Sequence, residues 1–285
     1  MKYYAAVVNE DEIKATCFMP PYQILASYHY FKNTPELIKS CLLKYYDVLI
    51  DSGAFSAANS NKNINIDDYC KFIKDTGVTN YAGLDVIGDA KATLENTEYM
   101  IQKHGLNPIP TFHLGSKIED LDRLLKYNYI ALGGLVFSEG IESHCNEVWS
   151  YILKKAPKIK VHGFGLTNIE LMQKYPWYSV DSSSFKSCKR FGRQNILYNG
   201  FEWKTFSEPE YIEHLRGLGY NIPDVIAKSA AQSKEHELEI TANNKKRWFL
   251  YDYYSAQSYK MFGAHLKELN KIKDFSYLTS QNKLF

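Results

Sequence analysis

Short apolar runs alternate with longer amphipathic segments over the first two-thirds of the chain. The runs are rich in β-branched and aromatic residues, which is typical of strands buried on both faces of a parallel sheet. They span Tyr3–Val8, Ile24–Tyr30, Asp47–Asp51, Asn80–Val86, Pro108–His113, Tyr129–Leu135, Ile159–Gly163 and Tyr178–Asp181.

The segments between these runs place apolar residues three and four positions apart, as amphipathic helices do. Asp67–Asp75 begins with paired acids, which favour a helix N-terminus, and Gly105 is a C-cap candidate after Asp89–His104. The other predicted helices are Pro35–Tyr45, Lys117–Tyr127, Glu142–Ala156 and Asn168–Tyr175.

This alternation predicts βα units and a parallel sheet. Eight candidate strands favour an α/β fold of the (β/α)8 TIM-barrel type, which takes roughly 250 residues as one domain. An open doubly wound sheet is the alternative, because no clear helix separates the first two runs.

The pattern changes after Asp181. The basic segment 186–193 is predicted to be a loop, and Ser207–Leu218 a helix with Ser207 as N-cap. Beyond Pro223 the sequence favours helix and gives no strand signal. We therefore predict a single domain over residues 1–285, with the barrel at about 1–220 and a helical C-terminal extension at about 221–285.

The composition excludes two classes of protein. The 285 residues include 34 Lys+Arg and 32 Asp+Glu, for a formal charge of +2, and 15% are aromatic. A disordered tail protein would lack the aromatics, and a strongly basic nucleic-acid wrapper would carry more charge. Without an apolar run of about 18 residues or a secretory h-region, a cytoplasmic protein is expected, with reduced cysteines.

Three carboxylates follow predicted strands at the end where barrels carry their working residues: Asp51, Asp85 and Asp181. Helix N-capping is the alternative role for each of them. Two carboxylates that face one substrate are the usual equipment for breaking a glycosidic bond, since one attacks or shields the anomeric carbon while the other moves the proton.

Other residues share this rim. His113 ends the fifth run and Gly133-Gly134-Leu135 the sixth, while Phe55 follows the third. The glycines would let backbone N–H groups approach a ligand closely. The alternatives are a core histidine, a tight turn and a core phenylalanine.

The ordered motifs resemble those of the tRNA-guanine transglycosylase superfamily over about residues 45–190. They are Asp-Ser-Gly-Ala-Phe at 51–55, Gly-Leu-Asp at 83–85, Leu-Gly-Gly-Leu at 132–135, His-Gly-Phe-Gly at 162–165 and Val-Asp-Ser-Ser-Ser-Phe at 180–185. The resemblance implies a glycosyltransferase in which Asp181 attacks C1′ of a guanosine and holds a covalent intermediate. It implies Asp51 as the general acid/base, and Asp85 as the acceptor from N1–H and the 2-amino group of the base.

The resemblance also implies further base contacts. His113 falls near a family glutamine, although a shift by one would place Leu114 there. The backbone at Gly133, Gly134 and Leu135 would donate to O6 of the base, and Phe55 would stack on it.

The departures from the family favour its phage-type branch, the DNA deazaguanine transglycosylases. Ala54 and Ser56 replace family residues, and the region of the family zinc site has only Cys188, so no metal or cofactor is expected. The resemblance then implies DNA as the partner (tRNA as the alternative), a free 7-deazaguanine such as preQ0, and a phage-encoded protein acting in the host cytoplasm.

A basic segment follows Asp181. Lys186, Lys189, Arg190 and Arg193, with Phe191 among them, are candidates for phosphate contacts beside a flipped-out base. The alternative is a solvated basic loop. A second basic candidate is 245–248. Two other functions stay open: a barrel hydrolase or isomerase of a small glycoside or nucleoside, and an inactive base- or nucleic-acid-binding protein.

Overall fold

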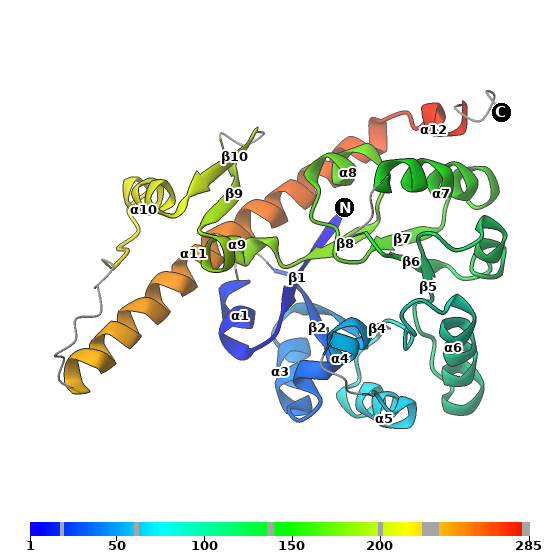
Figure 1. Ribbon diagram of the computed structural model, residues 1–285, viewed down its shortest axis with the longest axis horizontal. Helices are drawn as coiled ribbons and strands as arrows, with labels where there is room; N and C mark the ends of the chain where they lie inside the picture. The colour runs from blue at the N-terminus through cyan, green and yellow to red at the C-terminus, as the bar shows by residue number, and fades with distance from the viewer. Residues whose placement is uncertain (18–19, 60–62, 136–139, 199–201, 224–233, 281–285) are drawn as a thin grey trace.

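Eight parallel strands form one curled sheet in the order β4-β3-β2-β1-β8-β7-β6-β5 (Figure 1). The computed structural model describes residues 1–17, 20–59, 63–135, 140–198, 202–223 and 234–280. The predicted α/β fold of the TIM-barrel type, followed by C-terminal helix, is confirmed. The strands are β1 Lys2–Val7, β2 Tyr22–Ser27, β3 Tyr46–Asp51, β4 Asn80–Tyr81, β5 Thr111–His113, β6 Tyr129–Gly133, β7 Lys160–Gly163 and β8 Ser179–Ser182.

Hydrogen bonds join the two ends of this sheet. Ile109 N donates to Tyr81 O at 2.8 Å, and Gly83 N donates to Ile109 O at 3.0 Å. Each strand otherwise pairs with its neighbours in the sequence, and β1 pairs with β8. This connectivity excludes the open doubly wound alternative.

Helices follow the strands as the periodicity predicts, with local caps. Asn9 Oδ1 accepts from Glu12 N at 2.9 Å and starts a helix between the first two strands that the sequence did not indicate. Gly105, at φ +64°, ends α6 as expected. Segment 117–127 contains a 3-10 helix, η1, in place of the predicted α-helix. The elements are α1 Glu10–Ala15, α2 Tyr28–Phe31, α3 Pro35–Leu43, α4 Ala54–Asn59, α5 Ile66–Thr76, α6 Ala90–His104, η1 Ile118–Arg123, α7 Ile141–Lys155 and α8 Ile169–Lys174.

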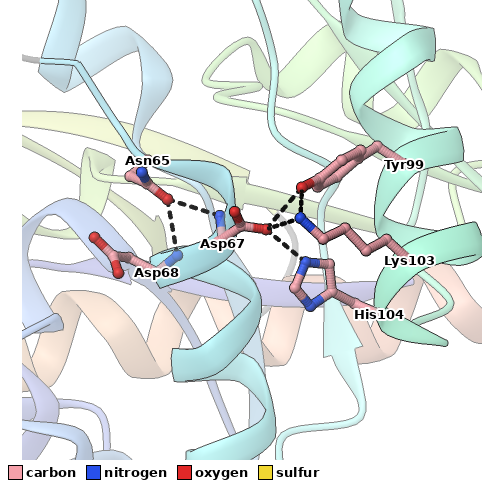
Figure 2. A network of polar contacts seen from close by, with 6 residues as sticks. All are labelled: Asn65, Asp67, Asp68, Tyr99, Lys103 and His104. Atoms are coloured by element: carbon pink, nitrogen blue, oxygen red, sulfur yellow. Dashed lines mark hydrogen bonds and ion pairs between the residues drawn. The ribbon is translucent and has the colours of Figure 1, made fainter.

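A polar network ties the start of α5 to the end of α6 (Figure 2). Asn65 Oδ1 caps α5 by accepting from Asp67 N at 2.8 Å. Asp67 Oδ1 in turn lies 2.7 Å from His104 Nε2 and accepts from Tyr99 OH at 2.9 Å. These bonds, with that from His104 first, lower the pKa of Asp67. The network therefore links α5 and α6 at the surface of the protein.

The chain after β8 leaves the barrel and returns to it. Residues 187–191, predicted as a loop, form a short helix, and an antiparallel hairpin that the sequence did not indicate follows (Figure 1). These elements are η2 Ser184–Lys186, α9 Ser187–Phe191, β9 Arg193–Tyr198, β10 Glu202–Ser207, α10 Glu208–Gly217, α11 Lys234–Ile272 and α12 Ser276–Ser280.

The long helix α11 packs directly against β1. The Met1 amino group donates to Gly263 O at 3.0 Å, and the rings of Tyr3 and Tyr259 stack with centroids 4.9 Å apart. A Cβ at Gly263 would lie 3.1 Å from Met1 O, so a small residue is needed where the helix crosses the strand. The division of the chain near residue 220 stays a prediction. Within the described part of the chain, no helix combines the length and apolarity that a bilayer span requires.

Candidate active site

The three predicted acids lie at the carboxyl ends of barrel strands. Asp51 is the last residue of β3, Asp181 lies in β8, and Asp85 follows β4. The charges of Asp85 and Asp181 both raise the pKa of Asp51, so each of these two carboxylates is within electrostatic range of Asp51. The fold therefore brings together the acids that the sequence singled out.

Two of these acids titrate near neutral pH. Burial, then the charge of Asp85, raise the pKa of Asp51 to about 7, against the opposing backbone hydrogen bond of Gly53. Burial raises the pKa of Asp85 to about 7, and the nearby Thr111 hydroxyl opposes the rise. Near pH 7 such carboxyls exist in both forms, which suits a group that must give and take a proton.

Asp181 is held differently. Its side chain is 8% exposed, and its Oδ1 accepts from Gly165 N at 2.9 Å. The same oxygen lies 3.2 Å from Nε2 of His162, a fully buried histidine of β7. One oxygen of this carboxylate is thus occupied within the protein.

His113 faces Asp85 across the mouth of the barrel. His113 Nε2 lies 3.9 Å from Asp85 Oδ2, and both side chains are mostly buried. Burial lowers the pKa of His113, which favours the neutral ring. The structure places His113 rather than Leu114 opposite the acid, since the contact is made by the histidine ring.

Several buried polar atoms at this mouth make no hydrogen bond of good geometry among the described residues, although the Thr111 hydroxyl lies close enough to Asp85 to oppose the rise of its pKa. They are Ser27 Oγ, Asp85 Oδ1, Thr111 Oγ1 and His113 Nε2. Most buried polar atoms in proteins are paired, and unpaired ones require an explanation. Here they line one place and include acceptors and a donor, as a site for a polar ligand would.

Two glycines keep the mouth open. A Cβ at Gly133 would lie 3.2 Å from Thr111 Cγ2 and 3.4 Å from His113 Nδ1. Gly53 has φ +79°, and a Cβ there would lie 2.5 Å from His29 Cβ and also overlap Ser27. Larger residues at either position would move the strand ends that carry the site.

The remaining predicted base contacts, Phe55, Leu135 and Gly134, differ in exposure and in backbone conformation. Phe55, in α4 directly after β3, is 52% exposed. Leu135 is 4% exposed and its side chain packs beside Gly163 in the core, so only its backbone is open to a role in the site. Gly134 has φ +87°, a conformation that favours glycine.

The residues of the basic segment 186–193 differ in exposure, and the prediction for Lys186 is corrected. Lys186 is 7% exposed and its Nζ lies 2.5 Å from Glu12 Oε2, so an internal partner takes the charge that was expected to contact phosphate. Lys189, Arg190 and Arg193 are exposed. Arg190 Nη1 donates to Ser183 Oγ at 3.2 Å, which places this cation beside the end of β8.

The residues of the second basic segment, 245–248, also differ in exposure. Lys245 and Lys246 are exposed on α11, whereas Arg247 is 5% exposed. Arg247 Nε lies 3.9 Å from Glu208 Oε1.

Sequence reasoning did not assign His162 and Ser179. His162 pairs in register with Ser179 on β8, and its Nδ1 lies 2.6 Å from Ser179 Oγ. Because Asp181 is two residues beyond Ser179, it points to the same side of the sheet. The sequence signal that could have identified His162 was a histidine and an acid, Asp181, near the ends of two consecutive predicted strands.

A cavity lies at the opposite, amino-terminal end of the barrel. It has a volume of about 250 Å³ and is lined by polar residues that include Asn80, Asn107 and Asn128. The predicted site residues do not line it. Within the described ranges, no group of three or more His, Cys, Asp or Glu side chains is arranged to hold a metal ion.

No protein-family model matches the chain, and no curated protein matches its sequence. Among solved structures, tryptophan synthase from M. tuberculosis, in a ligand-free TrpA mutant, is similar in fold at a TM-score of 0.43. The identity is 12%, and the match covers 66% of this chain and 86% of that chain. This likeness carries no argument about function.

Proposed function

We propose that this protein is a glycosyltransferase that exchanges guanine for a 7-deazaguanine base in nucleic acid, with DNA as the preferred substrate. The observation that carries the proposal is the set of three carboxylates at one barrel mouth, two with a pKa of about 7 and one held by hydrogen bonds on a single oxygen. The ordered motifs that resemble transglycosylases fall at these same positions.

In the first step Asp181 attacks C1′ of the nucleotide. A C1′–O bond forms to the carboxylate, and the C1′–N9 bond breaks with its electron pair moving to N9. Protonated Asp51 gives its proton to the departing guanine and becomes a carboxylate. A pKa of about 7 makes the protonated form of Asp51 available for this step near neutral pH.

In the second step the incoming base reverses the chemistry. Asp51 takes the N9 proton of the 7-deazaguanine, N9 attacks C1′, and the C1′–O bond to Asp181 breaks. Both carboxyl groups return to their starting forms, and the exchange requires no oxidant or reductant.

Base selection is assigned to Asp85 and His113. An ionised Asp85 would accept from N1–H and the 2-amino group of a guanine-type base, and these donors would offset the burial of its charge. Adenine has no such pair of donors and would leave the acid unpaired, which is worth about 10⁴-fold in selection. Neutral His113 supplies a further polar contact from the facing strand.

Nucleic acid, rather than a free nucleoside, is favoured by the exposed cations next to the mouth. Lys189 and Arg190 lie in α9 and Arg193 begins β9, after β8 and η2. Arg190 contacts Ser183, two residues from the proposed nucleophile. A base that reacts at the floor of this mouth must leave the stack of a duplex. The cations would contact the flanking phosphates.

The proposal is tested by an exchange assay with labelled guanine and labelled preQ0, offered with duplex DNA, single-stranded DNA and tRNA in parallel. Label is expected in DNA with the full chain and not with Asp181→Asn. Asp122→Asn, which changes an exposed carboxylate of η1, is the matched control and should keep the activity. Label in tRNA alone would replace DNA by tRNA as the substrate.

Label in neither polymer, with release of base from a nucleoside, would contradict the transferase and favour the barrel hydrolase. A trapped covalent adduct provides a second readout. It is expected in the full chain, should form more slowly in Asp51→Asn because the leaving base lacks its proton donor, and should be lost in Asp181→Asn.

A further inference from the structure

A continuous chain of hydrogen bonds crosses the barrel interior and ends on the proposed nucleophile. Tyr129 OH lies 2.6 Å from Ser179 Oγ, and Ser179 Oγ lies 2.6 Å from His162 Nδ1. The opposite ring nitrogen, His162 Nε2, lies 3.2 Å from Asp181 Oδ1. β6 and β7 contribute one member each, and β8 contributes both Ser179 and Asp181.

Aromatic rings pack around the buried imidazole of His162. His162 is fully buried, the ring of Phe164 lies edge-on with centroids 4.6 Å apart, and the ring of Tyr4 lies 6.1 Å away.

For a neutral imidazole, one arrangement of protons satisfies every contact in the chain. An ionised Asp181 only accepts, so Nε2 of His162 must carry the proton that faces it. In a neutral ring Nδ1 is then an acceptor, so Ser179 donates to it. Ser179 Oγ in turn accepts from the hydroxyl of Tyr129.

We propose that His162 is a positioning residue that selects which oxygen of Asp181 reacts. Nε2–H of His162 and N–H of Gly165 both point at Oδ1, so the remaining oxygen, Oδ2, is the one that attacks C1′. Ser179 holds the ring in the required tautomer, because the bond at one imidazole nitrogen sets the proton on the other. The kinetic consequence rests on the proposed function, whereas the tautomer does not.

The tautomer is read directly by NMR of the full chain labelled with ¹⁵N-histidine, with the His162 signals assigned from their loss in His162→Gln. We expect a protonated Nε2 and an unprotonated Nδ1. Ser179→Ala should add a population of the other tautomer. Tyr129→Phe is the matched control and should leave the tautomer unchanged, since Ser179 can still donate to Nδ1. A proton on Nδ1 in the unaltered chain would overturn the proposal.

Kinetics separate positioning from simple packing. His162→Gln keeps a donor near the place of Nε2 and should retain kcat within about tenfold, whereas His162→Phe fills the same space without a donor and should lose about 10²-fold in kcat. The KM for the free base should not change in either variant, because His162 contacts Ser179 and Asp181 rather than the proposed base contacts. Equal activity of the two variants would overturn the assignment.

The two proposals fail in different ways. If the unaltered chain exchanges no base while His162 carries its proton on Nε2, the proposed function fails and the positioning arrangement stands. If exchange is robust while the proton sits on Nδ1, the proposed function stands and the role of His162 is wrong.

Discussion

Lys186 Nζ and Glu12 Oε2 lie 2.5 Å apart although 174 positions separate the two residues in the sequence. Their side chains are 9% and 13% exposed, so this is a buried ion pair between η2, directly after β8, and α1. Asp252 of α11 lies near the same pair, and burial, then the charge of Glu12, raise its pKa to about 7. A cation predicted to hold nucleic acid thus joins the first helix to the end of the barrel.

Lys186→Met should destabilise the protein by about 3 kcal/mol, because it leaves Glu12 buried without its cation. Chemical unfolding monitored by circular dichroism measures this change. The exposed neighbour provides the control, since Lys189→Met should stay within about 0.5 kcal/mol. A Lys186→Met chain as stable as the parent would show that the pair contributes no net stability.

The contribution of Asp51 and Asp85 to the stability of the protein should fall as the pH rises from about 4 to about 7. Asp51 and Asp85 have a pKa of about 7 when folded, above the ordinary value of 3.8, so the folded chain binds more protons in this window. Asp51→Asn should therefore raise the free energy of unfolding at pH 8, by about 2 kcal/mol, and have little effect at pH 4. Asp85→Asn should behave in the same way.

Unfolding curves at both pH values test this sign. Asp252 also has a raised pKa and remains in both variants, so the difference from the parent chain isolates the site acids. A loss of stability at pH 8 on either substitution would contradict the burial argument. The gain would also identify these acids as residues kept at a cost to stability, as catalytic groups often are.

Gly133→Ala should weaken base binding more than it weakens the fold. The new methyl group would lie 3.4 Å from His113 Nδ1 and 3.2 Å from Thr111 Cγ2, so the ring must shift by a few tenths of an ångström. We expect a rise in KM for the free base of about tenfold with a stability loss of about 1 kcal/mol. Gly217→Ala, at the end of α10 where nothing lies within 4 Å of the added Cβ, is the control and should leave KM unchanged with no loss of stability. An unchanged KM would argue against His113 as a base contact.

The sequence predicted the barrel because its strands are buried and carry a clear apolar signal. It missed the helix at 10–15 because only Ile13 and Ala15 are buried there, too few for a helical period to be visible. It missed the hairpin of β9 and β10 because most of β10 is exposed and polar, with Phe206 as its one fully buried residue. Local patterns cannot reveal elements that are stabilised by contacts with distant segments.

The candidate active site likewise contains residues that the sequence could predict and residues that it could not. Asp51, Asp85 and Asp181 were predictable because an acid that ends an apolar strand is unusual. The burial of Lys186 was not, since it depends on Glu12 and on the return of the chain after β8. The role of His162 depends on the register between β7 and β8, which no single segment encodes.

Removal of the exposed cations should weaken nucleic-acid binding in a salt-dependent way. Each of Lys189→Ala, Arg190→Ala and Arg193→Ala should reduce the slope of log K against log salt by about 1 if its side chain contacts a phosphate. Fluorescence anisotropy with a labelled duplex, at several salt concentrations, measures this slope. Lys44→Ala removes an exposed cation that precedes β3 at the opposite end of the barrel, and it should leave the slope unchanged. An equal effect of Lys44→Ala would indicate nonspecific attraction, and an unchanged slope in all three variants would exclude this surface as the docking site.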